Sequence, residues 1–521
     1  MDLNIQKYEK NNQLILKIRN DTDRLVTCFF VSDGFEEKRI DTKLFPNHQT
    51  KISLDLSYND NLTIDYESEV IQEEKKVEDL TNGSIKKKMI LFAIPIFLSS
   101  LFQTTYNLVD SLIVGKFLGK EALAAVSTSG NLIYLFTSFF LGASQGAGIL
   151  IAKYFGAKKY HEMSKTIHVN IIMALISGII LTLLGVILTP SILRWMNTAE
   201  DVLPQAIDYF RFYFLGVIGI VLYNVFSSTL NSVGNSRRPL YYLTIACILN
   251  VMLDLFLIGY LELGVKYAAI ATTISQFFSA SLCLIYLLRI KAVYKVSVKR
   301  LEFSWKKIKE ILLYGIPTGI QNSVIGLANV LVQSNVNTFG SDAMAGYGSY
   351  IKIENFVFTP INAFSLAIST FIGQNLGAKQ YERAKKGAKF AIFTLLIMAE
   401  VFGIFFFILA PHLIALFNSD PEVVRYGVMH ARVTSLFFFL LAFSHGIASL
   451  CRGSGRPIVA MLVMLLVWCL FRVIYVYTAL EIRRELWVIS MAYPITWFIS
   501  SVIYLFYYLK SDWIHNFEHN K

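Results

Sequence analysis

The sequence predicts an all-α polytopic membrane protein with twelve transmembrane helices in two pseudo-symmetric six-helix bundles, preceded by a small, soluble, all-β domain. Long apolar runs recur along the chain, a repeat with a period of about 221 residues divides them into two sets, and the first 80 or so residues alternate polar and apolar side chains instead. The expected boundaries are 1–83 for the soluble domain and linker, 84–300 for the first bundle and 301–521 for the second.

Residues 1–83 are the first predicted element. Their alternating pattern and their Asn-Asn and Asn-Asp turn signals indicate short strands, and a charged linker, EEKKVEDLTNGSIKKK, follows them. No cleavable signal peptide is visible, so membrane insertion is expected to begin near Met89. The segment could be a stabilising appendage or a regulatory, partner-binding module, and the sequence does not choose between them.

The membrane helices are predicted from composition. The chain has 521 residues, of which 55% are hydrophobic and 16% charged, and its mean hydropathy is +0.51. A helix needs roughly 20 apolar residues to cross a ~30 Å hydrocarbon core. Uncharged runs of that length occupy residues 89–109, 122–152, 212–236, 267–288, 311–341 and 486–509. They are apolar on every face, whereas strands of a membrane barrel alternate, so helices are expected.

The net charge of +11 is explained by topology. Basic residues lie between the apolar runs and form no single patch, which argues against a nucleic-acid partner. With the start of the chain inside the cell, the loops on that side carry about 25 Lys and Arg and the opposite loops about 7. We therefore expect a plasma-membrane protein with both termini in the cytoplasm. The five cysteines include no close pair, so neither a disulfide framework nor a cysteine metal site is expected.

The repeat predicts two bundles in the same orientation. Ile94-Pro95 matches Ile316-Pro317, FLGKEALAA matches FGSDAMAG, and FGAKKYHE matches LGAKQYER. An even number of spans in each half keeps the halves parallel, so they can enclose a cavity between them. This arrangement is typical of a transporter and not of an enzyme.

Polar residues inside the spans are the candidate site. Asp110 shares a span with Pro95, whose ring should weaken or bend that helix and make it a hinge. Asn250 and Asp254 are four residues apart and so lie on one helical face, and Thr272 in the next span adds a hydroxyl. Such oxygens suit Na⁺, and two carboxylates in apolar surroundings favour uptake of a proton. Alternatively, Asp110 is interfacial and the other residues only hold helices together.

The ordered set of motifs resembles the multidrug and toxic compound extrusion (MATE) family over residues 85 to about 510. It comprises the repeated layout, Pro95 with Asp110, GQNLGAKQYERA, and NVMLD after GNSRRP. The resemblance implies a monomeric antiporter with two lobes around a central cleft. Such a protein exports small organic, cationic or amphipathic compounds in exchange for H⁺ or Na⁺ and needs no cofactor. The β-like segment is not part of the family pattern.

The same resemblance assigns roles to residues. It implies that Asp110, Asn250, Asp254 and Thr272 form the cation-coupling site, which is a metal site only if Na⁺ is the coupling ion. It also places Gln103 and Tyr106 at the substrate cavity, although ordinary helix packing would explain them equally well.

The second half departs from the first at one position. Where Asn250 and Asp254 have their counterparts, VWCLFRVIY carries Arg472, so a second cation site of the same design is not expected. Arg472 could balance charge in the substrate cavity, or it could pair with Glu354 or Glu400, and we favour this structural role. A flippase for a lipid-linked or amphiphilic substrate is the alternative function, and a membrane transferase or receptor is a more distant one.

Overall fold

The computed structural model describes the backbone of residues 4–10, 13–19, 24–32, 37–44, 49–55, 63–70, 79–195, 198, 200–515 and 517. Side chains are described from residue 79 onward, except those of Lys120, 127–141 and Ala143 and the gaps in the backbone ranges.

The strands are β1 (Asn4–Lys10), β2 (Gln13–Arg19), β3 (Arg24–Ser32), β4 (Glu37–Leu44), β5 (Gln49–Asp55) and β6 (Thr63–Val70). They pair antiparallel in two three-stranded sheets, β1-β2-β5 and β4-β3-β6. Their side chains lie outside the described residues, so the soluble all-β domain stays a prediction.

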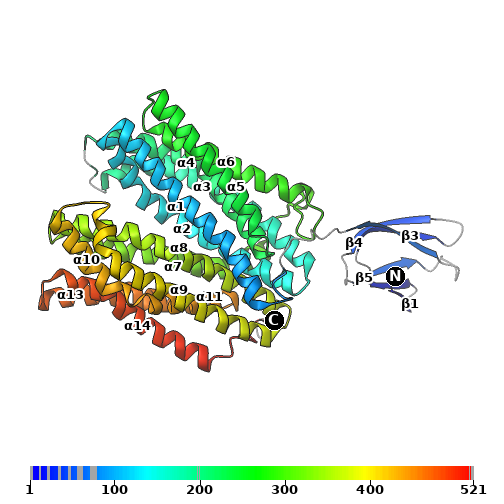
Figure 1. Cartoon of the computed structure of the whole chain (residues 1–521). Coiled ribbons are helices and arrows are strands. Elements are labelled where there is room, and N and C mark those ends of the chain that lie inside the picture. The colour runs from blue at the N-terminus through cyan, green and yellow to red at the C-terminus, as the bar shows by residue number, and fades with distance from the viewer. Residues whose placement is uncertain are drawn as a thin grey trace.

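Long apolar helices make up the rest of the chain (Figure 1). Within the described residues, ten helices are long and apolar enough to cross a membrane. They are α1 (Ile85–Leu118), α3 (Tyr160–Trp195), α4 (Leu203–Ser232), α5 with the π-helical segment η1 (Arg237–Tyr260), α6 (Lys266–Arg289), α7 (Trp305–Asn337), α8 (Ser341–Gly377), α9 (Tyr381–Ala415), α12, η3 and α13 together (Pro457–Ile482), and α14 (Leu486–Lys510).

Two further places complete the expected order of spans. Helices α10 (Pro421–Ser435) and α11 (Phe438–Gly453) form an eleventh span if the 56° bend between them lies inside one crossing. Helix α2 (Lys120–Gly156) is 37 residues long, but only part of its side chains is described. The prediction of a helical, multi-pass membrane protein is confirmed at the level of ten to twelve apolar helices.

The helices form two bundles that exchange their first segments. Most of α1–α6 surrounds one hydrophobic core and most of α7–α14 surrounds another. However, Met89 and Phe92 at the start of α1 are buried in the second core, while Ile311 and Tyr314 at the start of α7 are buried in the first. Each bundle therefore contributes the beginning of its first helix to the other, which fastens the two bundles together at that end.

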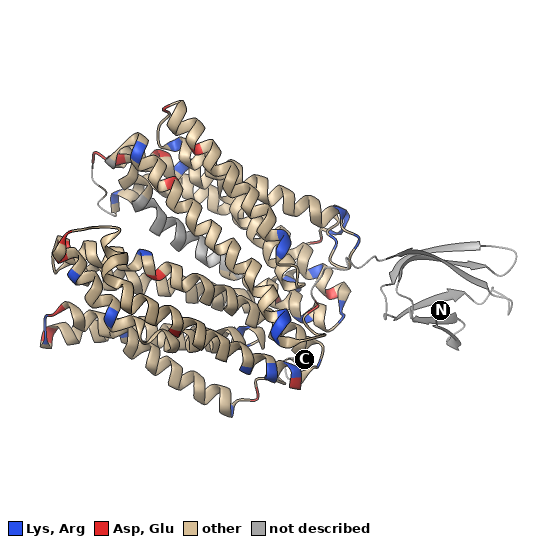
Figure 2. Cartoon of the chain, in the orientation of Figure 1, with Lys and Arg blue, Asp and Glu red and all other residues tan. Residues whose placement is uncertain are grey.

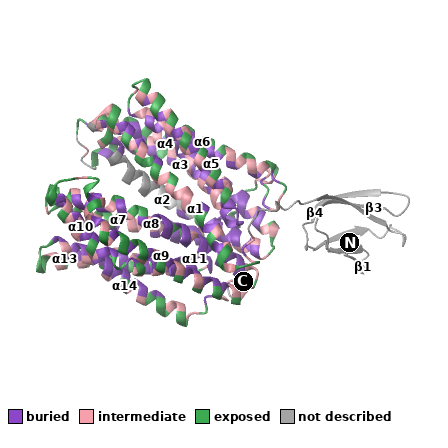
Figure 3. Cartoon of the chain, viewed as in Figure 1, coloured by how far each residue is buried: buried purple, intermediate pink, exposed green. Residues whose placement is uncertain are grey.

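The bundles meet most closely where α2 packs against α7 and α8. Gly142 faces the backbone of Gly319, Gly146 faces that of Gly315, and Gly156 faces that of Gln374. Only residues without a side chain permit such an approach between helices. Buried residues gather in this region (Figure 3), which we call the closed end. It carries the turns at residues 157–159, 233–236, 378–380 and 454–456.

The segment before α1 is inserted at the closed end. The side chain of Leu80 is fully buried. Its backbone N–H donates to Gln374 Oε1 over 3.1 Å, and its carbonyl accepts bonds from Asn375 Nδ2 and from Arg383. Gln374 also donates to the carbonyl of Ser232 at the end of α4, over 2.7 Å. The linker therefore contacts the second bundle at a residue that is itself bonded to the first.

Candidate functional site

Helix α1 places two polar side chains inside the first bundle. Tyr106 and Asp110 are buried and lie four residues apart, so they share a helical face. Pro95 lies inside the same helix, which continues through it for 34 residues in all. Next to the proline, the Phe92 carbonyl accepts a 2.9 Å hydrogen bond from Ser236 Oγ. The turn between α4 and α5 is thus tied to α1 at its proline.

Helices α5 and α6 supply the facing residues. Asn250 and Asp254 are buried on one face of α5, and the π-helical segment η1 begins at Leu255, directly after the aspartate. Such wide turns are frequent at functional sites because they re-aim the side chains around them. On α6, Thr272 and Gln276 face α5 and α1. Asn250 Nδ2 donates to Thr272 Oγ1 over 3.5 Å, and Gln276 Nε2 donates to the Tyr106 hydroxyl over 3.2 Å.

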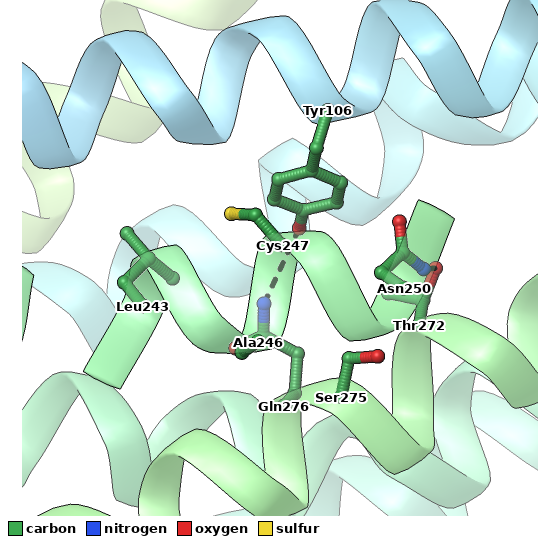
Figure 4. A pocket seen from close by; sticks show the side chains of 8 residues that line it. All are labelled: Tyr106, Leu243, Ala246, Cys247, Asn250, Thr272, Ser275 and Gln276. Carbon is green, nitrogen blue, oxygen red and sulfur yellow. Dashed lines mark hydrogen bonds between the residues drawn. The ribbon is translucent and has the colours of Figure 1, made fainter. Parts of the chain in front are cut away.

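A narrow pocket lies between these helices (Figure 4). The space between its atoms, including the part open to the outside, is about 180 Å³, but no position in it accommodates a whole water molecule. Its lining consists of Tyr106, Leu243, Ala246, Cys247, Asn250, Thr272, Ser275 and Gln276. Asp110 and Asp254 come four residues after Tyr106 and Asn250 on their helices, about 6 Å along the axis. The two carboxyl groups are close enough to interact electrostatically and to share a hydrogen bond when one of them carries a proton.

The oxygens of this site are short of partners. With both carboxyl groups ionised, the buried oxygens of this site that lack a hydrogen-bond donor among the described residues are Asp110 Oδ1, Asn250 Oδ1, both carboxylate oxygens of Asp254, Ser275 Oγ and Gln276 Oε1. No Lys or Arg nitrogen in that part of the chain lies within 4 Å of either carboxylate. Leaving a buried polar atom unsatisfied costs about 1–3 kcal/mol, and more for a charged group. A proton or a small cation bound here would relieve that cost.

The donor set is suited to a hard cation. All the unpaired atoms are oxygens, which are the ligands that such cations prefer. Among the described residues, no three His, Cys, Asp or Glu side chains come together as they do in many structural metal centres. The site offers two carboxylates and several neutral oxygens instead, which fits an exchangeable ion better than a permanently held metal.

The structure gathers most of the sequence-predicted site residues. Asp110, Asn250, Asp254 and Thr272 come together as expected, although their role as cation ligands stays a prediction. Gln103 is half-buried on α1 and does not line the pocket. Sequence reasoning missed Ser275 and Gln276, even though their spacing from Thr272 places all three on one helical face.

Arg472 lies in the other bundle and is 1% exposed, so it does not line an accessible cavity. It makes no ion pair within 4 Å with Glu354 or Glu400, although Glu354 is close enough to interact with it electrostatically. Its guanidinium donates to Thr496 Oγ1 instead. Glu354 Oε1 accepts a 2.6 Å bond from the hydroxyl of Tyr350. The two side chains therefore hydrogen-bond to different neighbours while they still interact through their charges.

Comparison with known proteins identifies the family. A family model described as MatE matches the chain twice, at residues 95–256 and 317–478. The chain belongs to the MatE family. The two matches begin 222 residues apart, at positions 95 and 317, so each half of the repeat contains one MatE unit. Proteins of this family are in general transporters and not enzymes.

Curated relatives of this MatE protein carry transporter names. "Probable multidrug resistance protein YoeA" of Bacillus subtilis is 29% identical over 394 residues, which cover 74% of this chain and 85% of the relative. "Multidrug export protein MepA" of Staphylococcus aureus is 22% identical over 380 residues, 72% of this chain and 84% of the relative. The "FAD transporter" of Shewanella oneidensis is 26% identical over 354 residues, which cover 67% of this chain and 77% of the relative.

Solved structures agree on the fold. "Outward-facing conformation of a multidrug resistance MATE family transporter of the MOP superfamily" superposes with a TM-score of 0.79 at 22% identity, covering 84% of this chain and 98% of that one. "Crystal structure of MATE in the bent conformation" also gives 0.79 at 22% identity, covering 86% and 99%. The MatE fold therefore spans the helical part of the chain, and the names of the relatives support drug export.

Proposed function

We propose that this MatE transporter exports small organic, cationic or amphipathic compounds in exchange for H⁺ or Na⁺ by alternating access. The coupling ion binds among Asp110, Asn250, Asp254 and Thr272. The observation that carries the proposal is the cluster of unpaired buried oxygens around two carboxylates with no basic partner. A site of this kind is incomplete without a proton or a cation.

Ion and substrate need not touch to compete. A ligand shifts a conformational equilibrium only by the difference in its affinity for the two states. An ion that fills the oxygen cluster draws α1, α5 and α6 together, whereas substrate favours the other arrangement. Moving one charge through ~100 mV is worth about 2.3 kcal/mol, which supports a concentration ratio of about 50-fold. The membrane gradient therefore suffices to drive export.

We further propose that the closed end faces the cytoplasm of the cell and that the membrane is the plasma membrane. Lys and Arg gather at that end of the bundles in Figure 2, as expected for cytoplasmic loops. They include Lys158, Lys159, Arg237, Arg238, Lys379 and Arg456. Both termini then lie in the cytoplasm, and residues 1–83 form a β-rich cytoplasmic domain whose role is either stabilisation or regulation.

The test is transport in proteoliposomes by Asp110→Asn and Asp254→Asn. Each substitution keeps the size of the side chain but removes its charge, so we expect gradient-driven efflux of a fluorescent organic cation to be lost. Asp208→Asn is the matched control because Asp208 is exposed on α4 of the same bundle. Imposing ΔpH alone and then ΔNa⁺ alone identifies the ion. Undiminished gradient-driven transport in both variants would remove the proposal.

A flippase is the alternative function, and basic side chains lining the cleft would favour it. Arg472, one of the candidates for that role, is 1% exposed. The structure therefore supplies no specific observation for the flippase.

A further inference from the structure

The duplication pairs Arg472 with Asn250. The offset of 222 residues between the two MatE units brings position 250 onto position 472. Both residues lie on the fifth span of their bundle, and both donate to a threonine on the sixth. Asn250 Nδ2 reaches Thr272 Oγ1 over 3.5 Å. Arg472 Nη2 reaches Thr496 Oγ1 over 2.8 Å, and its Nε reaches the same atom over 3.3 Å. Both contacts join the fifth span to a threonine of the sixth, although the same offset brings Thr272 onto Pro494 and not onto Thr496. The donor is neutral in one bundle and positively charged in the other.

The guanidinium makes no direct ion pair with the described residues, and it interacts with Glu354 only at longer range. Its central carbon lies 4.4 Å from the ring centroid of Tyr493 and 5.3 Å from that of Trp468. No carboxylate oxygen of the described residues lies within 4 Å of its nitrogens. Burying a charge without a directly bonded counter-ion costs several kcal/mol, and the ring faces and a longer-range attraction return only part of it. A hydrophobic side chain would fill the same space, so packing alone does not account for an arginine.

The two bundles are electrostatic opposites at this place. The first has two carboxylates and no basic side chain close to them. In the second, the same offset brings Asp110 onto Val332 and Asp254 onto Val476. Both valines are buried. The first bundle therefore lacks a cation. The second already contains one, within electrostatic range of Glu354, and has no counterparts of Asp110 and Asp254 to hold another.

We propose that the guanidinium of Arg472 takes, in the second bundle, the place that the exchangeable cation takes in the first. It ties α13 to α14 as the bound ion would tie α5 to α6, so the second bundle stays permanently in its cation-loaded arrangement. The proposal rests on the proposed function and adds that only the first bundle cycles between loaded and empty. One transport cycle then uses one exchangeable cation site, and Arg472 is a positioning residue for it.

The experiment compares Arg472→Lys, Arg472→Met and Arg472→Ala with the wild type in proteoliposomes. Thermal unfolding in detergent is measured alongside transport. Lysine keeps the charge, so we expect transport to fall by no more than about 3-fold, which corresponds to about 0.65 kcal/mol. Methionine removes the buried charge and fills the space, so the protein should unfold at the same or a higher temperature, yet transport should fall at least about tenfold.

Chemical rescue keeps the test decisive if Arg472→Met folds poorly. Millimolar guanidinium ion added to Arg472→Ala should restore transport several-fold, whereas urea, which is similar in shape but neutral, should not. If Arg472→Met transports like the wild type, or if guanidinium ion rescues no better than urea, the proposal is overturned. A wild-type protein that responds to neither ΔpH nor ΔNa⁺ would instead contradict the proposed function, so the two failures are distinguishable.

Discussion

Gly146 at the closed end allows a quantitative test of alternating access. A Cβ atom added to Gly146 of α2 would lie 2.3 Å from the backbone nitrogen of Gly315 and 2.5 Å from its Cα. Ordinary contacts begin at 3.4 Å, so Gly146→Ala requires α2 and α7 to separate locally by about 1 Å. Both obstructing atoms belong to the backbone, and no change of rotamer relieves the overlap.

The expected size of the effect follows from the cost of overpacking. Inserting a methyl group into a closely packed contact costs about 1–3 kcal/mol. If the penalty applies only while α2 and α7 touch, it shifts the equilibrium about 5- to 150-fold toward the conformation in which the closed end is open. Transport should slow in proportion because each cycle must pass through the disfavoured state.

The assay measures this opening directly by electron paramagnetic resonance. Spin labels at Lys158 and Lys379 report the separation of the α2–α3 and α8–α9 turns, in a background whose native cysteines are replaced. The control is Gly348→Ala in α8, where an added Cβ meets no atom within 4 Å. The reasoning is refuted if Gly146→Ala gives the same distance distribution and the same transport rate as the control.

Three further substitutions probe individual contacts. Arg383→Ala removes a guanidinium that donates to backbone carbonyls of the linker at residues 79–84. Losing these charge-assisted hydrogen bonds should weaken the attachment of the linker by about 1.5–3 kcal/mol, so limited proteolysis should cut the linker faster. Tyr106→Phe leaves the buried amide of Gln276 without its acceptor. The free energy of unfolding should fall by about 1–3 kcal/mol, which thermal unfolding measures. Lys307→Met breaks two ion pairs of 2.7 Å. It should lower the free energy of unfolding by up to about 3 kcal/mol, since the partners are partly exposed, and the melting temperature should fall accordingly.

Each of these substitutions has a matched control on the surface. Lys385→Ala removes an exposed ion pair with Glu382, while Tyr241→Phe and Lys306→Met change exposed side chains of the same types. The controls should change proteolysis or melting only slightly, because exposed ion pairs and surface side chains contribute about 0–1 kcal/mol. A variant that behaves like its control would show that the contact in question contributes nothing measurable.

Local chemistry explains which parts of the site the sequence predicts. Asn250 and Asp254 share a face because an α-helix repeats every 3.6 residues, and this holds whatever surrounds the helix. Gln276 was missed because its importance depends on the Tyr106 hydroxyl, 170 positions away in the chain. The direct ion pair expected for Arg472 does not form, for a similar reason. Spacing along the chain does not reveal that Thr496 and two aromatic rings lie against its guanidinium while Glu354 stays at longer range.

By itself, the sequence determined that the chain has membrane-spanning helices, that they repeat in two halves, and which helical faces carry the polar residues. These features depend on hydropathy and helical periodicity, which act over a few turns. Only the tertiary structure decided that α1 and α7 begin in each other's bundle, that Leu80 is inserted beside Gln374, 294 positions away, and that the oxygens near Asp254 lack partners. Those outcomes are set by packing between distant segments, where burial and the available neighbours decide which polar groups are satisfied.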